Sequence, residues 1–242
     1  MGGAYAQGEE TTRTCEEKEG EEEEVVVPTT TIIYYTSNRE DPVFEGRIIR
    51  SLLHSSGGKL PVISVSQKPM ALGTNICVGE VGISGFNALR QYQIGVKAAK
   101  TRFVCSAESD TISPQDYFRF VPPTDDTFYL ASPFYVMIAN GWIRNMFYEK
   151  IPHEQCLVAN RDMLIDRMED EFKGRDEWED IKAKASILTL TKNREMFPVH
   201  PPVVSIKTDR NMHKKTRVSW QSRCYELPGI GTYSGVIRKY KP

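Results

Sequence analysis

The stretch TRFVCSAESDTISPQDYF, residues 101–118, decides the fold that this sequence predicts. It begins with an apolar run, residues 103–105, and then presents two carboxylates one residue apart, Glu108 and Asp110. A buried strand with acidic side chains at its carboxyl end fits this pattern, and open α/β sheets bind ligands beyond that end. Carboxylate oxygens suit Mg²⁺ or Mn²⁺, which often bridge a protein to phosphate oxygens. The spacing of these two acids alone favours a simpler interpretation, an ordinary strand followed by a solvated acidic turn, because this pattern is very frequent.

Two strand-and-helix units precede this stretch. Residues 29–35 (TTTIIYY) and 60–65 (LPVISV) predict buried strands, and residues 43–54 and 86–99 have the apolar spacing of helices. Strands joined through a helix run parallel, with a right-handed crossover. We therefore expect a nucleotide-binding half-sheet with polar strand ends. Those ends carry Thr36, Ser37, Asn38, Arg39, Gln67 and Lys68. No glycine-rich phosphate motif follows the first strand, which excludes dinucleotide-binding and P-loop folds.

The second half of the sequence predicts more mixed structure. Residues 125–138 and 142–148 read as two strands of a hairpin that turns at Asn140 and Gly141. Residues 153–168 predict a helical or strand-to-helix segment, and residues 203–207 (VVSIK) predict a further strand. We expect the chain after Trp220 to pack as an irregular basic arm.

Charge is distributed unevenly along the 242 residues. Residues 1–28 contain nine Glu against one Arg and one Lys, so we expect a disordered acidic tail before a single domain over residues 29–242. From Lys182 onward, thirteen Lys and Arg face three acids, a basic quarter that could meet a polyanion. The sequence shows no transmembrane run, and its five scattered cysteines fit free thiols in a reducing cytoplasm.

The order of these segments resembles that of GT-A glycosyltransferases. It is most similar to the family-2-like enzymes and, within them, to short glycosyltransferase-like proteins of tailed phages. The resemblance covers roughly residues 31–216 and implies an α/β fold, with a mixed sheet flanked by helices in a single domain. We would divide that domain into a nucleotide-sugar half (29–120), an acceptor half (121–216) and the basic arm (217–242). A phage-encoded protein would act in the host cytoplasm.

The resemblance also implies a site. Glu108 and Asp110 would hold Mn²⁺ or Mg²⁺, although the family usually has Asp at the first position, and a late histidine, His213, would complete the metal site. The donor would be bound by the strand ends named above together with Asn87, Lys207, Lys214 and Lys215. In inverting members, an aromatic-flanked Glu-Asp pair supplies the base that activates the acceptor, which here is Asp180 or, less favoured, Glu179. Residues 160–162 could contact the acceptor, but they equally read as a polar helix start.

The sequence thus predicts a metal-dependent glycosyltransferase that moves a sugar from a nucleoside diphosphate sugar, with UDP-sugars favoured, to a hydroxyl. Inversion is the expected stereochemistry, and no membrane partner is expected. A hydroxymethylated base in phage DNA is one acceptor that the basic quarter and the phage-like resemblance suggest. Two alternatives stay open: a catalytically silent sugar- or nucleotide-binding module of a virion, and a nucleotidyltransferase that consumes nucleoside triphosphates.

Overall fold

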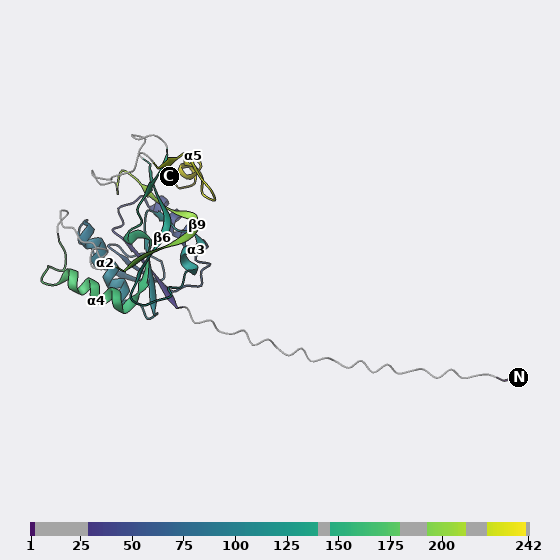
Figure 1. The fold of residues 1–242 in the computed structure, drawn as a ribbon, viewed down its shortest axis with the longest axis horizontal. Coiled ribbons are helices and arrows are strands. Elements are labelled where there is room, and N and C mark those ends of the chain that lie inside the picture. The colour runs from purple at the N-terminus through teal and green to yellow at the C-terminus, as the bar shows by residue number, and fades with distance from the viewer. Residues whose placement is uncertain (3–28, 140–145, 180–192, 212–221, 241–242) are drawn as a thin grey trace.

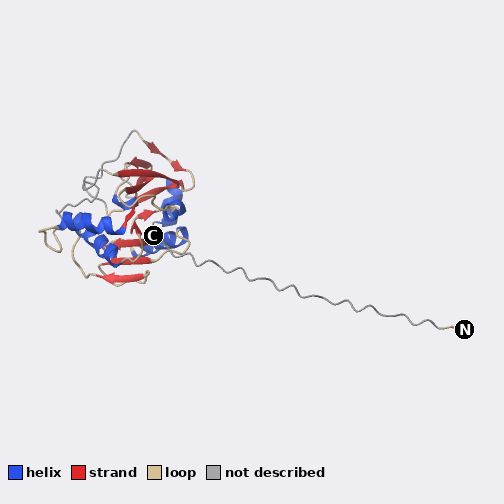
Figure 2. Ribbon diagram, turned by 60° about the horizontal axis from the view of Figure 1, so that its bottom comes forward, coloured by secondary structure: helices blue, strands red, loops and turns tan. Residues whose placement is uncertain are grey.

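A computed structural model describes residues 1–2, 29–139, 146–179, 193–211 and 222–240, and Figure 1 shows their arrangement. A ten-stranded mixed sheet runs through the described part of the chain, and helices pack against it (Figure 2). The predicted acidic tail falls on residues 3–28, outside the described ranges. The fold is mixed α/β in one domain, as the sequence predicts.

The first half of the sheet is parallel. β1 (Thr30–Thr36) lies between β2 (Val62–Ser66) and β4 (Phe103–Glu108), and both neighbours run parallel to it. α1 (Pro42–Ser55) and α2 (Gly85–Ala98) connect these strands where the sequence predicts helices. The carboxyl ends of all three strands therefore meet at one edge of the sheet.

One strand of this half has no clear sequence signal. β3 (Thr74–Cys77) pairs parallel to β2 at the outer edge of the sheet. Its residues are exposed or only partly buried, so no apolar run marks it.

The second half of the sheet is mixed. Its strands and helices are β5 (Thr111–Ile112), α3 (Gln115–Arg119), β6 (Phe128–Ile138), β7 (Phe147–Lys150), the 3-10 turn η1 (Glu154–Cys156), β8 (Leu157–Asn160), α4 (Arg161–Phe172) and β9 (Arg194–Lys207). β8 runs antiparallel to β4, and β6 lies between β9 on one side and β8 and β7 on the other. The order across the sheet is β3-β2-β1-β4-β8-β6-β7-β10, with β9 beside β6 and β5.

These strands confirm most predictions for this half. β6 and β7 pair antiparallel as the predicted hairpin, although its turn at Asn140 and Gly141 lies outside the described residues. Residues 153–168 form the predicted strand-to-helix segment, β8 followed by α4.

The expectation of an irregular C-terminal arm is wrong. After β10 (Arg223–Cys224), a small hairpin of β11 (Glu226–Leu227) and β12 (Gly231–Thr232) leads into α5 (Tyr233–Tyr240). Tyr233, Val236 and Tyr240 of α5 are buried. This three- and four-residue spacing is the apolar stripe of a helix, obscured in the sequence by the nearby glycines.

Alternate side chains of the strands enter two apolar layers, one on each face of the sheet. On β1, Ile33 and Tyr35 join the layer that contains α2 and α4, while Ile32 and Tyr34 join the layer that contains α1 and α3. A third cluster packs α5 and the start of α1 against the ends of β6 and β9. The sheet is therefore covered on both faces, which leaves its edge of strand ends for a ligand.

Side-chain caps fix where the two crossover helices begin. Asp41 Oδ1 accepts hydrogen bonds from the backbone N–H of Val43 and Phe44 at the start of α1. Ser84 Oγ accepts one from Asn87 N, 2.9 Å away, at the start of α2. Each such cap stabilises a helix by about 1 kcal/mol. The caps place the amino ends of both helices beside the carboxyl ends of the parallel strands.

The described cysteines, Cys77, Cys105, Cys156 and Cys224, are free thiols, as the sequence predicts. Within the described ranges, no helix has the length and apolar character needed to cross a bilayer.

Candidate functional site

A cavity of about 500 Å³ opens at the carboxyl edge of the parallel strands. The ends of β1, β2 and β4 form its floor, and the start of α2 forms one wall. The chain around β7, η1 and the end of β9 forms the opposite wall. The residues that line the cavity include Tyr35, Thr36, Ser37, Arg39, Gln67, Ser84, Ala88, Glu108, Asp110, Lys150, His153, Gln155, Lys207 and Asn211.

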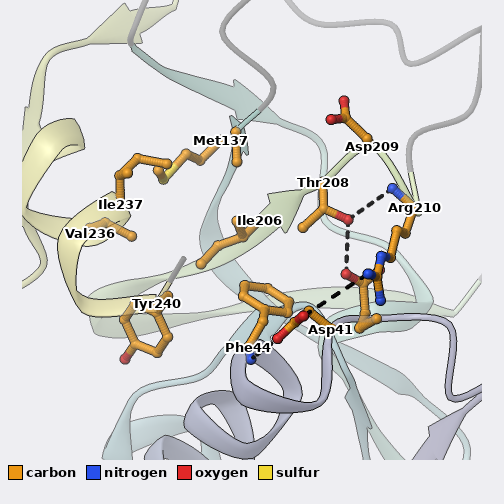
Figure 3. Close-up of a pocket in the computed structure, with 12 residues that line it drawn as sticks. Asp41, Phe44, Met137, Ile206, Thr208, Asp209, Arg210, Val236, Ile237 and Tyr240 are labelled. Atoms are coloured by element: carbon orange, nitrogen blue, oxygen red, sulfur yellow. Dashed lines mark hydrogen bonds and ion pairs between the residues drawn. The ribbon is translucent and has the colours of Figure 1, made fainter. Parts of the chain in front are cut away.

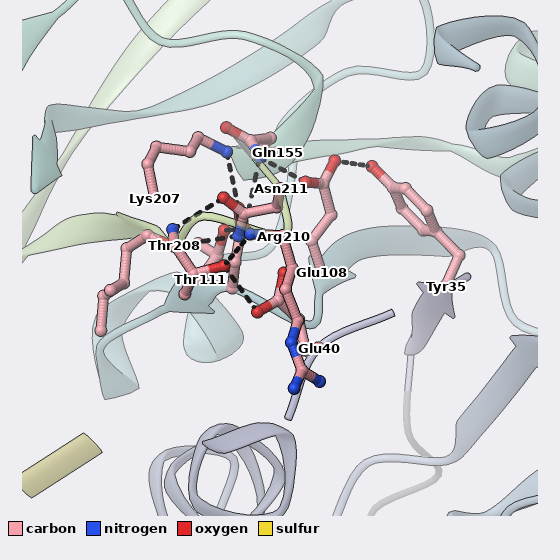
Figure 4. Close-up of polar contacts among 11 residues, drawn as sticks. Tyr35, Glu40, Glu108, Thr111, Gln155, Lys207, Thr208, Arg210 and Asn211 are labelled. Carbon is pink, nitrogen blue, oxygen red and sulfur yellow. Dashed lines mark hydrogen bonds and ion pairs between the residues drawn. The ribbon is translucent and has the colours of Figure 1, made fainter. Parts of the chain in front are cut away.

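Glu108 and Asp110 both line this cavity, as the sequence predicts, and Figure 4 shows Glu108 with Tyr35 and Gln155 beside it. Glu108 Oε1 accepts a hydrogen bond from the hydroxyl of Tyr35 at 2.5 Å, and its other oxygen accepts one from the side-chain amide of Gln155. The same amide nitrogen lies 3.5 Å from Asp110 Oδ1. Gln155 therefore bridges the two carboxylates.

Asp110 is paired with a lysine. Lys207 Nζ lies 2.6 Å from Asp110 Oδ2, and the side chains of Lys207 and Asp110 are only 12% and 5% exposed. The amide of Asn211 donates a second hydrogen bond to the same oxygen at 3.0 Å, while the hydroxyl of Thr111 donates to Asp110 Oδ1 at 2.9 Å. The contact of Lys207 with an acid of the motif is consistent with its predicted place in the site.

The local electrostatics set the charges of these groups. Burial raises the pKa of Glu108 to about 7, with a further contribution from the charge of Asp110, against the lowering effects of Lys207, Tyr35 and Gln155. Burial alone would lower the pKa of Lys207, but the negative charges of Asp110 and Glu108 outweigh it and raise that pKa above its usual value. Lys207 is therefore a permanent cation of the cavity.

Lys150 and His153 line the cavity on the same side. Burial and then the positive charge of Lys207 lower the pKa of Lys150. Burial, with the charges of Lys150 and Lys207, lowers the pKa of His153 to about 3, so its imidazole is neutral near pH 7. Two lysines thus face one end of the cavity, the end nearer Asp110.

Away from the two lysines, the cavity is lined by backbone and polar groups, among them the cationic Arg39. Gln91 Nε2 donates to the carbonyl oxygens of Thr36 and Val65, which ties α2 to the ends of β1 and β2. Gln67 Nε2 donates to the carbonyl of Gly82 at 2.7 Å. Of the strand-end residues predicted to bind the donor, Thr36, Ser37, Arg39 and Gln67 line the cavity.

Asn38 and Lys68 are absent from the cavity lining. Asn38 has a φ of 53°, a left-handed conformation that asparagine tolerates better than most residues. Its Oδ1 accepts from Lys68 N at 2.8 Å. These two residues join the loops after β1 and β2, which shapes the rim of the cavity.

Asn87 is also absent from the cavity lining, and its side chain is hydrogen-bonded to the backbone of two other segments. Its side-chain nitrogen donates to the carbonyls of Val81 and Glu179, and its oxygen accepts from Glu179 N at 2.9 Å. The Glu179 carboxylate itself receives two hydrogen bonds from Arg175, at 2.6 and 2.7 Å. Asn87 therefore fixes residue 179 one helical turn from Ser84.

Several predicted residues are not placed. Asp180, His213, Lys214 and Lys215 lie outside the described residues, so their roles stay predictions. Residues 160–162 are described, and they lie away from the cavity. Asn160 pairs with Phe103 at the start of β4, the opposite edge of the sheet from Glu108, and its side chain caps α4. The prediction that these residues contact an acceptor in this cavity is therefore wrong, and the alternative prediction, a polar helix start, is confirmed.

A divalent cation, which the resemblance implies, does not fit the acidic pair as the described residues hold it. All four carboxylate oxygens of Glu108 and Asp110 already accept from protein donors. A doubly charged ion 4 Å from the Lys207 ammonium would be repelled by about 8 kcal/mol at an effective dielectric constant of about 20. Within the described ranges, no three His, Cys, Asp or Glu side chains are grouped to hold a metal ion.

Several polar groups of this site were not predicted from the sequence, among them Tyr35, Lys150, Gln155 and Asn211. Tyr35 and Lys150 carry a usable signal, because each stands at or next to the end of a strand that the sequence predicts. Gln155 and Asn211 carry none, because their place depends on how η1 and the turn after β9 pack against β4.

A second cavity of about 200 Å³ lies behind the end of β9 (Figure 3). Its floor is apolar, with Phe44, Ile206 and Val236, and its rim is polar. Thr208 lines it and donates to Glu40 Oε2 at 2.8 Å. Residues 206–211 therefore form a wall between the two cavities, with Lys207 facing the larger one.

No known family model matches the sequence, and no curated protein matches it. Solved structures do match the fold. Residues 1–349 of TarS from S. aureus, in complex with UDP-GlcNAc, align with a TM-score of 0.51 and 12% identity over 78% of this chain and 61% of that one. The chain therefore spans about three fifths of that structure.

Two further structures align at lower scores. The inositol-1-phosphate CTP transferase from T. maritima has a TM-score of 0.49 and 9% identity over 77% of this chain and 92% of that one. The glycosyltransferase GlyE of Streptococcus pneumoniae has a TM-score of 0.44 and 8% identity over 79% and 58%. At 12% identity, the likeness to the TarS structure shows the fold alone, which is the GT-A fold.

Proposed function

We propose that this chain is a glycosyltransferase that takes its sugar from a nucleoside diphosphate sugar bound in the larger cavity. The observation that carries the proposal is the position of that cavity. It lies at the carboxyl edge of the parallel strands of a GT-A sheet, and it brings the acid-x-acid pair and two lysines to one end. Its volume of about 500 Å³ is in the range of small-ligand sites.

The two ends of the cavity suggest how the donor lies. The nucleoside would occupy the end where Thr36, Ser37 and Gln67 offer hydroxyl and amide groups. The diphosphate would lie toward Lys150 and Lys207, whose ammonium groups would stabilise the negative charge that grows as the sugar leaves. The low exposure of Lys207 strengthens its share of that interaction, because little water competes for the charge.

Asp180 is our candidate for the base that deprotonates the acceptor hydroxyl. Its neighbour Glu179 is held by Asn87 beside the start of α2, where Ser84 lines the cavity. The Glu179 carboxylate is bound twice by Arg175, so it is a poorer proton acceptor than an unpaired carboxylate would be. The match of Glu179 and Asp180 to the family's Glu-Asp pair suggests that the reaction would invert the configuration at the anomeric carbon, as in the inverting members of that family.

UDP-sugars are the first donors to test, because the TarS structure holds UDP-GlcNAc. The acceptor class is a hydroxyl compound. Hydroxymethylated DNA, with its base flipped out of the helix, is the acceptor that the sequence suggests.

The test is a nucleoside diphosphate release assay over UDP-, GDP- and TDP-sugars. Wild type should release one nucleoside diphosphate, and Lys150→Met should reduce the rate at least tenfold by removing one of the two lysine charges near Asp110. Lys97→Met is the matched control, because Lys97 is an exposed lysine paired with Glu169, outside the lining of the cavity, and it should keep the wild-type rate.

The rival functions give other products. Release of pyrophosphate from a nucleoside triphosphate, with no nucleoside diphosphate from any sugar donor, would establish a nucleotidyltransferase instead. Donor binding without release from any donor would establish a binding module.

A further inference from the structure

We propose that Lys207 is the resident cation of this site and stands where a divalent metal would otherwise bind, so that a nucleoside diphosphate binds without Mn²⁺ or Mg²⁺. The statement about the diphosphate rests on the proposed function, whereas the statement about the metal does not. The carrying observation is the contact between Lys207 Nζ and Asp110 Oδ2 at 2.6 Å, inside the cavity wall (Figure 4).

Backbone pairing holds Lys207 at this place. β5 and β9 pair with Thr111 opposite Ser205, and Ile206 N donates to the carbonyl of Asp110 at 2.7 Å. The register therefore sets Lys207 one residue beyond the backbone contact to Asp110. A lysine in this position cannot move away from the acidic pair without breaking the sheet or changing its rotamer.

The turn after β9 provides a second attachment. Asn211 Nδ2 donates both to Asp110 Oδ2 and to the carbonyl of Ile206, at 3.0 and 3.1 Å. Asn211 Oδ1 accepts from Thr208 N at 2.9 Å. The side chain of Asn211 thus closes the turn around Lys207 and fills the remaining approach to that carboxylate oxygen.

Both oxygens of Glu108 also have protein donors, Tyr35 on one and Gln155 on the other. A metal ion on the acidic pair would compete with these donors and with the two on Asp110 Oδ2, and it would lie close to an ammonium group. The ammonium has three N–H groups, and Asp110 receives one of the hydrogen bonds, which leaves donors for phosphate oxygens.

The decisive experiment measures Mn²⁺ binding to the full chain by electron paramagnetic resonance, with no nucleotide present. The signal of hydrated Mn²⁺ falls when the ion binds to the protein, so the readout needs no activity. Wild type and the control Lys97→Met should leave the signal unchanged. Lys207→Met, which keeps most of the side-chain volume but removes the charge, should bind about one Mn²⁺ per chain at least tenfold more tightly than wild type.

Stability gives a second readout on the same proteins. Lys207→Met leaves two acids without their cation, and Mn²⁺ should raise its melting temperature while leaving that of wild type unchanged. Stoichiometric Mn²⁺ binding by wild type would overturn the proposal. A folded Lys207→Met protein that gains no Mn²⁺ affinity would also overturn it, and if that variant does not fold, the wild-type titration alone decides.

A calorimetric titration with uridine diphosphate then tests the donor half of the proposal. Wild type should bind uridine diphosphate with the same affinity in EDTA and in Mn²⁺. In EDTA, Lys207→Met should bind it at least tenfold more weakly than wild type. Binding by wild type only in Mn²⁺ would overturn the inference and leave the glycosyltransferase proposal standing. An absence of nucleotide binding under both conditions would count against the proposed function, while the paramagnetic result on the metal would still stand.

Discussion

Replacing Glu108 with glutamine should make the protein more stable at neutral and alkaline pH. Burial raises the pKa of Glu108 from 4.5 to about 7, so the folded chain retains a proton that the unfolded chain releases. Between about pH 4.5 and about pH 7, the free energy of unfolding therefore falls by about 1.4 kcal/mol per pH unit, or about 3 kcal/mol in all. Below about pH 4.5, both states are protonated and this loss disappears.

Glu108→Gln removes this pH dependence, because an amide does not titrate. It still accepts from Tyr35, but its amide nitrogen faces the amide of Gln155, a mismatch that costs about 1 kcal/mol at every pH. The variant should thus be less stable than wild type by about 1 kcal/mol near pH 4.5 and more stable by about 2 kcal/mol near pH 8.

Urea unfolding of both proteins at several pH values measures this difference, in which the contributions of all other titrating groups cancel. Thermal melting should show the same crossover as a gain of about 5 °C for the variant near pH 8. A difference between the two proteins that stays constant with pH would mean that Glu108 titrates alike in the folded and unfolded chains and that burial does not raise its pKa.

Two further predictions concern the same half of the sheet. Tyr35→Phe removes a hydrogen bond to the charged form of Glu108 and should raise the pKa of that carboxyl by about one unit, which moves the pH-dependent loss of stability upward in the same urea titrations. Gly95→Ala should destabilise the fold by about 1 to 3 kcal/mol, because the added carbon would lie 2.4 Å from a methyl group of Ile33. Gly46→Ala in α1 is its control, because the added carbon meets nothing within 4 Å, and it should stabilise the fold by about 0.5 to 1 kcal/mol. Equal effects of the two glycine substitutions in denaturant unfolding would contradict the packing argument.

The parallel half of the sheet, except for its edge strand β3, could be predicted because its signals are local. β1, α1, β2, α2 and β4 each carry an apolar pattern or a capping residue of their own, and a helical crossover leaves one parallel arrangement. The edge where Glu108 and Asp110 emerge follows from that arrangement. The acidic pair was therefore predicted together with its place in the fold.

Long-range packing placed Gln155 and Asn211 in the site, and the sequence carries no local sign of either contact. Gln155 reaches Glu108 across 47 residues, and Asn211 reaches Asp110 across 101. Asn87 was predicted to bind the donor, but its side-chain amide is hydrogen-bonded to the backbone of residue 179. Nothing in the sequence distinguishes this structural role from ligand binding. The C-terminal helix was missed for a similar reason, since its buried stripe has meaning only against the ends of β6 and β9.

Calorimetric binding of a UDP-sugar to Ala88→Trp and Ala98→Trp shows whether the cavity at the carboxyl edge of the parallel strands is the donor site. Ala88 lines the cavity, whereas Ala98 is exposed at the far end of the same helix, so only the first indole would fill the site. Ala88→Trp should therefore bind the donor at least tenfold more weakly than wild type, while Ala98→Trp should bind it as wild type does. Undiminished binding by a folded Ala88→Trp protein would place the donor outside this cavity.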